Sequence, residues 1–292
     1  MSAISVSVAE EFLAQSQEFV KRARAAGLED ADRYYWYHTI DLGDGIVTPG
    51  LYDYRKTISA FPFPADMTGM TVLDVGSATG YFAFHFERRG ARVISVELPS
   101  LRDLDRFPGQ DVESSLKKIE AMAFPPTLDQ EKFPRRGYTE RELYWYLLEG
   151  PFRFCRERLG SRVERCYSTI YDLTLERTGV REGFDYVFLG DVLIHTLYPL
   201  RALAALAALC RGTLLFAGVL PEGPQEPPAM KYIGGDDLAG DEVAWWHPNL
   251  SCLMQMLRKL GFAHVEQTGT HRGVLRPAGF PFERAILRAI KR

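Results

Sequence analysis

Short apolar runs alternate with helix-like segments along the chain from Thr71 onward. Runs of β-branched and aromatic residues predict strands, and apolar residues spaced three and four positions apart predict helices. The strands predicted in this way are 72–75, 92–96, 163–167, 184–189 and 213–219. Helices are predicted at 82–89, 200–210 and 251–260. This alternation indicates a doubly wound α/β fold, with a mostly parallel sheet covered by helices on both faces.

Two further strand-like runs, 264–268 and 284–290, lie on either side of a connection that contains glycine and proline. An antiparallel edge pair is a common way to complete an otherwise parallel sheet. We therefore expect these two runs to close the sheet as its sixth and seventh strands.

Two regions depart from this rhythm. Residues 1–70 contain an amphipathic helix at 8–26, followed by Trp36 to Gly50, a loop rich in aromatic residues, Gly and Asp. The segment 101–160 separates the second and third strands and is too long for a plain loop. We expect residues 71–292 to form one cofactor-binding catalytic domain, with 101–160 as a helical lid or substrate-binding insertion and 1–70 as an N-terminal cap.

Composition narrows the classes of function. Hydrophobic residues at 46% and charged residues at 25% are typical of soluble globular proteins. A formal net charge of −3 provides no global positive field for a polyanion. The longest apolar stretches, such as 202–210, are shorter than the ~20 residues that span a bilayer. Four separated cysteines at no metal-ligand spacing predict no metal site, and we expect a cytoplasmic protein without membrane contact.

A glycine-containing turn follows the first predicted strand. Gly76 and Gly80 let the backbone approach a ligand closely, and the next helix directs its first N–H groups at whatever binds there. Ser77 lies between them, and Asp74 stands just before them. The spacing is GxxxG instead of GxGxxG, and Asp74 repels phosphate but orients an ammonium group. These features favour S-adenosylmethionine over NAD.

Three further strand ends point to the same site. Glu97 ends the second strand, where the acid of a dinucleotide fold accepts both ribose hydroxyls. Tyr171 and Asp172 follow the third strand, and Gly190 with Asp191 follows the fourth. Open parallel sheets bind ligands at these ends. The sequence therefore predicts a nucleoside cofactor, with Asp172 accepting the adenine amino proton.

With this strand, turn and helix, with Glu97 and with Asp172, residues 71–218 and the closing strands resemble class I S-adenosylmethionine-dependent methyltransferases. The resemblance implies a Rossmann-like methyltransferase fold, S-adenosylmethionine as the cofactor and a transferase activity. It also implies that Glu97 binds the ribose and Asp172 the adenine.

Four segments resemble one branch of that family, which contains the tRNA wobble-uridine carboxymethyltransferases. They are Trp36 to Gly50, Phe188 to His195, Pro199-Leu200 and Trp246 to Asn249. Enzymes of that branch hold a carboxylated S-adenosylmethionine with a Lys near the amino end, a Tyr before the loop His and an Arg in the last strand. Arg284 matches the Arg, whereas Ile194 stands at the Tyr position and Tyr37 or His38 where the Lys is expected. This difference favours methyl transfer over carboxymethyl transfer.

Three residues are candidates for the chemistry around the cofactor. His195 follows the fourth strand and has a side chain suited to taking a proton near neutrality, although a hydrogen bond to the loop backbone is an equal alternative. Tyr37 and His38, in the loop that covers the cofactor in relatives, would hold the cofactor's carboxylate or gate the acceptor. A packed aromatic lid is the alternative for both.

The function predicted from these features is methyl transfer to oxygen or nitrogen of a small bacterial metabolite, such as an intermediate of secondary metabolism. One alternative is cyclisation of S-adenosylmethionine to azetidine-2-carboxylate with release of methylthioadenosine. Another is methyl or carboxymethyl transfer to the wobble uridine of tRNA, and a third is S-adenosylmethionine binding without catalysis. The large insertion motivates the first alternative and the branch resemblance the second.

Overall fold

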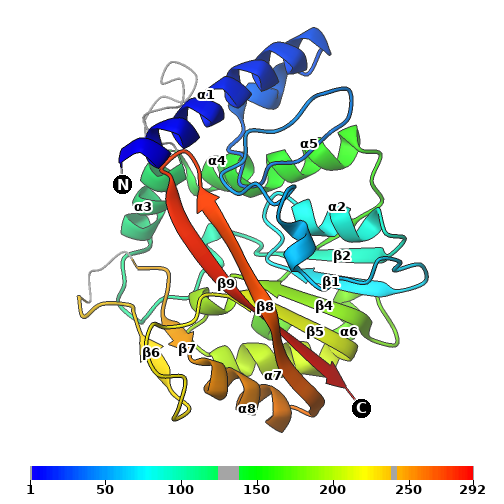
Figure 1. Ribbon diagram of the computed structural model, residues 1–292, viewed down its shortest axis with the longest axis vertical. Coiled ribbons are helices and arrows are strands. Elements are labelled where there is room, and N and C mark those ends of the chain that lie inside the picture. The colour runs from blue at the N-terminus through cyan, green and yellow to red at the C-terminus, as the bar shows by residue number, and fades with distance from the viewer. Residues whose placement is uncertain (1, 124–137, 238–241, 292) are drawn as a thin grey trace.

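A seven-stranded sheet forms the centre of the computed structural model, whose described residues are 2–123, 138–237 and 242–291 (Figure 1). The strand order is β3-β2-β1-β4-β5-β9-β8. All neighbours from β3 to β5 pair in parallel, and β9 is antiparallel to β5 and to β8. The strands are β1 Thr71–Val75, β2 Arg92–Glu97, β3 Glu164–Tyr167, β4 Phe184–Gly190, β5 Cys210–Gly218, β8 Phe262–Leu275 and β9 Phe280–Lys291. The predicted seven-stranded, mostly parallel sheet is confirmed.

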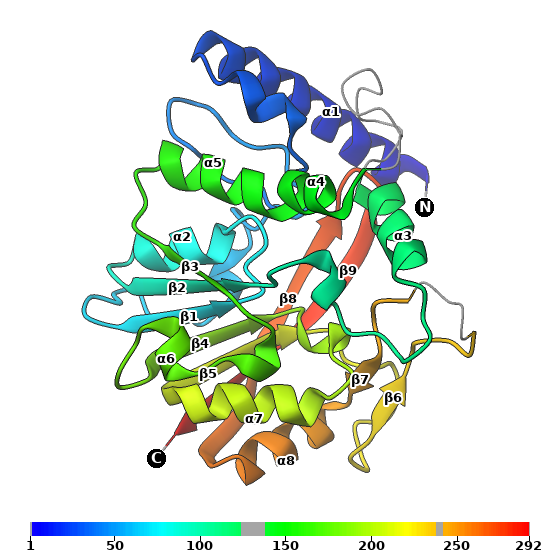
Figure 2. The same ribbon diagram turned by 180° about the vertical axis from the view of Figure 1, so that it is seen from behind.

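Helices cover both faces of the sheet because alternate strand residues point to opposite sides. Phe188 packs in the core under α1 (Ser2–Ala25), α2 (Tyr81–Glu87) and α5 (Gly150–Arg158). Its neighbour Leu189 packs in the opposite core. That core lies under α6 (Leu175–Thr178), α7 (Pro199–Leu209) and α8 (Leu250–Lys259), which Figure 2 shows on the other side. Short 3-10 turns occupy Glu29–Arg33, Ile58–Ala60, Leu101–Asp103, Ile170–Asp172 and Leu193–His195.

The hairpin β8–β9 is much longer than the predicted runs 264–268 and 284–290. Its strands continue through Gly269, Gly273 and Pro281 to a turn beyond Leu275. Glycine and proline were expected to end the pairing, but an irregularity between Gln267 and Gly269 absorbs the first glycine and the ladder then resumes. The hairpin tip therefore extends beyond the sheet towards α1 (Figure 1).

The insertion is helical, as predicted. It contains α3 (Val112–Ala123), α4 (Glu140–Tyr144), a π-helical turn Trp145–Glu149 and then α5. Thr139 and Glu142 form a capping box at the start of α4. The helical segment that begins at α4 continues past Gly150, because the π turn and a proline near the start of α5 keep the chain helical. Four leucines give the insertion a small core of its own: Leu101, Leu116, Leu143 and Leu147.

A small second sheet pairs β6 (Met230–Tyr232) with β7 (Trp246–Pro248). Trp245, just before β7, is fully buried, and its indole Nε1 donates a hydrogen bond to the carbonyl of Asp105 in the insertion. This contact ties the segment after β5 to the segment after β2. Within the described ranges, every helix is too short or too polar to cross a bilayer.

Candidate active site

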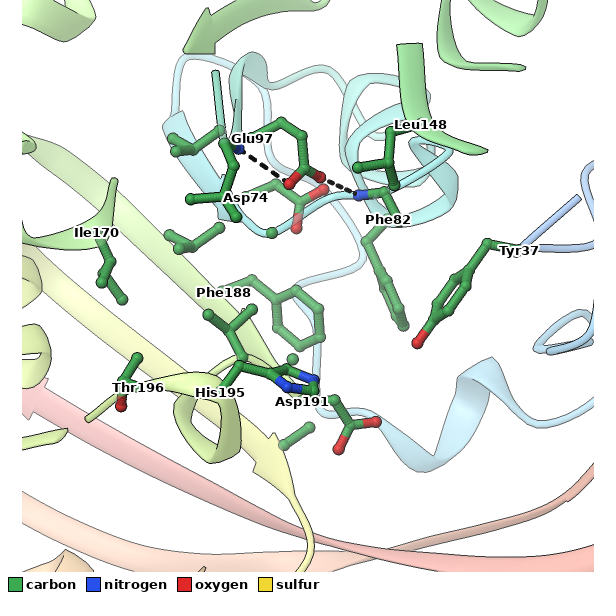
Figure 3. A pocket seen from close by; sticks show the side chains of 18 of the residues that line it. Tyr37, Asp74, Phe82, Glu97, Leu148, Ile170, Phe188, Asp191, His195 and Thr196 are labelled. Atoms are coloured by element: carbon green, nitrogen blue, oxygen red, sulfur yellow. Dashed lines mark hydrogen bonds between the residues drawn. The ribbon is translucent and has the colours of Figure 1, made fainter. Parts of the chain in front are cut away.

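A cavity of about 260 Å³ opens at the carboxyl ends of the parallel strands. Figure 3 shows Asp74 and Glu97 on one side of it, His195 and Asp191 on the other, and Phe82 and Phe188 between them. The sheet, the N-terminal cap and the insertion all contribute to its lining. Nine of the residues proposed from the sequence line it: Tyr37, His38, Asp74, Gly76, Glu97, Tyr171, Gly190, His195 and Arg284.

The turn after β1 brings the backbone close to the cavity. Gly76 has φ +69°, and a Cβ placed there would lie 2.3 Å from Cγ2 of Val192. Only glycine therefore fits both the conformation and the space. Asp74 is 1% exposed, and its Oδ2 has no hydrogen-bond partner among the described residues. An unpartnered buried oxygen of this kind costs free energy unless a ligand donates to it.

Glu97 is held firmly at the end of β2. Its Oε2 accepts the N–H of Ala78 at 3.0 Å and its Oε1 accepts the N–H of Leu98 at 3.0 Å, the dashed lines of Figure 3. Each carboxylate oxygen has further lone pairs for a ligand hydroxyl. Glu97 is thus oriented before any ligand binds.

Burial also changes the ionisation of Asp74. Desolvation, with a smaller contribution from the negative charge of Glu97, raises the pKa of this carboxyl to about 7, although the charge of Arg165 lowers it. A cationic ligand beside Asp74 would lower this pKa, because a nearby positive charge favours the ionised form of a carboxyl group.

The loop from Trp36 to Gly50 covers one side of the cavity with Tyr37 and His38. His38 is 4% exposed, its Nδ1 lies 3.2 Å from Oγ1 of Thr79, and burial lowers its pKa to about 3. The imidazole is therefore neutral at physiological pH and carries no charge for a carboxylate. A Cβ on Gly50 would lie 1.9 Å from the carbonyl carbon of His38, so this loop needs glycine there.

Arg284 lines the cavity, but an internal carboxylate matches its charge. Its Nε lies 2.6 Å from the carboxylate of Asp191, and its charge also acts on the half-buried Tyr52. Asp191 has φ 53°, an uncommon conformation for a residue with a side chain. The arrangement leaves Arg284 little charge to offer to a ligand's carboxylate.

His195 ends a short 3-10 turn beyond β4, on an exposed part of the cavity rim. Its Nδ1 lies 2.6 Å from the carbonyl oxygen of Val243, an acceptor, so Nδ1 carries the proton. Nε2 is then left as a proton acceptor. The hydrogen bond to the loop backbone and a role as base, the two alternatives posed by the sequence, are therefore compatible.

Three of the proposed residues do not line the cavity. Ser77 bonds instead to Ser95, and Gly80 precedes α2 with φ +91°. Asp172 is exposed and accepts a hydrogen bond from Oγ1 of Thr169 at 2.7 Å. The 3-10 turn Ile170–Asp172 explains this position, because it directs Ile170 inwards and Asp172 outwards.

Other residues line the cavity without having been selected from the sequence. Asp103, Leu104, Asp105 and Leu148 come from the insertion, and Ser168, Thr169 and Ile170 come from the loop after β3. Asp105 accepts the hydroxyl of Tyr171 and, at 2.6 Å, the N–H of Leu197. No periodicity in the sequence marks these residues. An aromatic group completes the lining: Tyr54, Phe61, Phe82 and Phe188.

A family model described as a methyltransferase domain matches residues 50–267. The chain belongs to this family. Its members use S-adenosylmethionine, so the chain is an S-adenosylmethionine-dependent transferase. The cofactor and the enzyme class predicted from the sequence are confirmed.

Individual relatives agree with this assignment. A curated tRNA U34 carboxymethyltransferase from Dichelobacter nodosus (strain VCS1703A) is 25% identical over 213 residues, which are 72% of this chain and 50% of the relative. The methyltransferase chain thus spans half the length of that protein. The N-terminal domain of EvdMO1, solved with S-adenosylhomocysteine bound, superposes with a TM-score of 0.51 at 14% identity, over 94% of this chain and 97% of that one. This likeness shows the fold.

A magnesium protoporphyrin IX methyltransferase from Synechocystis PCC 6803, solved with S-adenosylmethionine bound, is more distant. Its TM-score is 0.44 at 13% identity, over 77% of this methyltransferase and 72% of that chain.

Proposed function

We propose that the protein transfers a methyl group from S-adenosylmethionine to oxygen or nitrogen of a small metabolite. The observation that carries the proposal is the placement of a cofactor-type wall, Asp74 and Glu97, opposite the proton acceptor His195 in one cavity of about 260 Å³. Small-molecule sites span roughly 300–1,000 Å³, so the volume of this cavity lies just below that range. A small acceptor fits it better than a tRNA loop does.

The residues on the cofactor wall fit S-adenosylmethionine. The unpartnered Oδ2 of Asp74 would accept from the cofactor's ammonium group, and Glu97 would accept the ribose hydroxyls. Leu98 and Ile170, at the end of β2 and after β3, would flank the adenine ring. Once bound, the cofactor supplies an electrophilic methyl group on a sulfonium centre.

The opposite wall would hold the acceptor. Phe82, Phe188 and Tyr54 offer apolar surface, and His195 offers Nε2 as acceptor for the proton that the nucleophile loses. The insertion residues Leu104 and Leu148 lie over the same cavity, so we assign 101–160 the role of a lid that excludes water.

Charge on the lining supports a small, neutral or cationic acceptor. Arg284 is balanced by Asp191. Four further carboxylates line the cavity: Asp74, Glu97, Asp103 and Asp105. A negative cavity attracts the cationic cofactor and repels RNA phosphate and a carboxylated cofactor. These charges favour methyl transfer to a metabolite over carboxymethyl transfer to tRNA.

Cofactor affinity is expected to rise with pH between 5.5 and 7. In the free protein Asp74 has a pKa of about 7, so its neutral form dominates below that value. The ammonium group binds the carboxylate form, so binding releases a proton and affinity falls about tenfold for each pH unit below 7. Calorimetric titration with S-adenosylhomocysteine over this range measures the slope.

Two controls isolate Asp74. Methylthioadenosine lacks the amino acid arm, so its affinity is expected to stay flat over the same pH range. The variant Asp74→Asn is expected to lose the slope for S-adenosylhomocysteine. A slope that persists in Asp74→Asn would assign the titration to another group.

Product analysis tests the proposed function directly. The protein is incubated with S-adenosylmethionine alone and then with pools of small hydroxyl and amine metabolites, and the nucleoside product is identified by mass spectrometry. S-adenosylhomocysteine formed only with a metabolite pool supports the proposal. Methylthioadenosine formed with the cofactor alone would show cyclisation or cleavage of its side chain, and turnover only with tRNA would show tRNA modification.

A further inference from the structure

A buried arginine lies behind the cofactor wall. Arg165 in β3 has a side chain that is 6% exposed, and its guanidinium lies 4.0 Å from the ring centre of Phe152. Its Nη1 donates to Oγ of Ser77 at 2.8 Å and to Oγ of Ser95 at 3.1 Å. Both Nη atoms donate to the carbonyl oxygen of Ala78 at 3.2 Å. The planar fork is therefore committed to the turn that follows β1.

That turn contains a residue in an unfavourable conformation. Ala78 has φ 47°, a region that residues with a Cβ seldom adopt. Arg165 holds the carbonyl of Ala78, and Glu97 holds its N–H at 3.0 Å. The two side chains thus fix both polar backbone groups of the strained residue between them.

Arg165 also faces three buried carboxylates. Its Nη2 lies 3.9 Å from Oε2 of Glu97, its Nε lies 3.9 Å from Oε2 of Glu149, and its charge acts on Asp74. Glu149 comes from the π-helical turn of the insertion and is 5% exposed. Burying these carboxylates without Arg165 would cost free energy, because desolvation disfavours their negative charge.

Three further side chains surround Arg165 and its carboxylates, but none of them is hydrogen-bonded to the Ala78 turn. Arg153 lies at the surface, with a side chain that is 56% exposed. Its Nε donates a hydrogen bond to Oε1 of Glu149 at 2.5 Å. Tyr167 donates to the same oxygen at 2.6 Å, and Tyr144 packs near Glu97 and donates to the carbonyl of Leu98. Arg153 thus shares a carboxylate with Arg165 without touching the turn, which makes it a matched control.

We propose that Arg165 is a positioning residue for cofactor binding, which holds the Ala78 turn in its binding conformation and offsets the buried negative charge of Asp74 and Glu97. This inference rests on the cofactor role proposed above for Asp74 and Glu97. Arg165 itself does not line the cavity and so acts through these two carboxylates and the turn.

Three variants test this role: Arg165→Met, Arg165→Lys and the control Arg153→Met. Calorimetric titration with S-adenosylhomocysteine from pH 5.5 to 8.5 gives the affinity and the pH midpoint of binding. Thermal unfolding over the same pH range, without any ligand, measures how much Arg165 stabilises the fold by offsetting the buried carboxylates. Wild-type protein is titrated first, because its failure to bind would contradict the proposed cofactor site and not the role of Arg165.

Arg165→Met is expected to bind about tenfold more weakly or worse, and its pH midpoint is expected to rise by about one unit or more. Its Tm deficit against wild type is expected to grow as pH rises, because loss of Arg165 raises the folded-state pKa of Asp74 further and a raised carboxyl pKa costs stability at high pH. Arg153→Met is expected to match wild-type affinity and midpoint. Unchanged affinity in Arg165→Met, or weaker binding with an unchanged midpoint, would overturn the proposal.

Arg165→Lys separates charge from geometry. Lysine keeps the charge but lacks the planar fork on Ala78, so the pH midpoint is expected to stay near that of wild type while the affinity falls about fivefold or more at every pH. This variant decides the matter if Arg165→Met does not fold. Wild-type affinity in Arg165→Lys would show that the fork does not position the turn.

Discussion

Glu97→Ala is expected to lower the affinity for S-adenosylhomocysteine by about 10²- to 10⁴-fold, the largest effect on binding at this site. The carboxylate is oriented by the N–H groups of Ala78 and Leu98, so its remaining lone pairs are ready for two ribose hydroxyls. A hydrogen bond to a charged group contributes about 1.5–3 kcal/mol, and two are lost. Calorimetry at pH 7.5 measures the change.

Glu164→Ala is the matched control. Glu164 lies on the neighbouring strand β3, but its side chain is exposed and paired with Arg92 at 2.9 Å on the surface. Surface pairs contribute about 0–1 kcal/mol, so cofactor affinity is expected to stay within about twofold of wild type. Wild-type affinity in a folded Glu97→Ala variant would remove Glu97 from the ribose site.

His195→Ala is expected to lower kcat by about 10²- to 10⁴-fold while leaving the affinity for S-adenosylhomocysteine unchanged. Nδ1 of His195 bonds to the carbonyl of Val243, so in the proposed function Nε2 accepts the proton that the methylated atom loses. The measurement is single-turnover methyl transfer to the metabolite identified by the product screen, across pH 6–9.

His195→Asn separates the base from the anchor of the loop. The asparagine amide offers a donor for the carbonyl of Val243 but no basic nitrogen. If the histidine acts as base, Asn is expected to be as slow as Ala. Full activity in the Asn variant would show that His195 only holds the loop.

The local features of the site were readable from the sequence. The strand before Gly76 and the carboxylate at Glu97 depend on residues close together in the chain, and parallel strands bring their carboxyl ends to one edge. Both line the cavity as predicted. His195 and Tyr37 were found in the same way, from their places beside a strand end and in a loop of unusual composition.

What the sequence did not reveal depends on contacts between distant segments. Asp105 lies in the insertion, and its place at the cavity is fixed by Tyr171 and Leu197, neither of which is near it in sequence. In the sequence, nothing distinguishes Arg165 from other charged residues. It becomes the buried partner of Glu97 only because β3 pairs with β2. Asp172 lies on the surface because it ends a 3-10 turn, a local geometry that the sequence pattern did not predict.

The tip of the β8–β9 hairpin holds the N-terminal loop in place. Arg276, at that tip, donates to the carbonyl of Gly50 and to Oγ1 of Thr39, and its backbone N–H donates to the carbonyl of Leu51. The same hairpin carries Arg284 into the cavity. During synthesis on the ribosome, the loop with Tyr37 and His38 emerges more than two hundred residues before the strands that secure it. The nascent chain can therefore secure this loop only after the β8–β9 hairpin has left the exit tunnel.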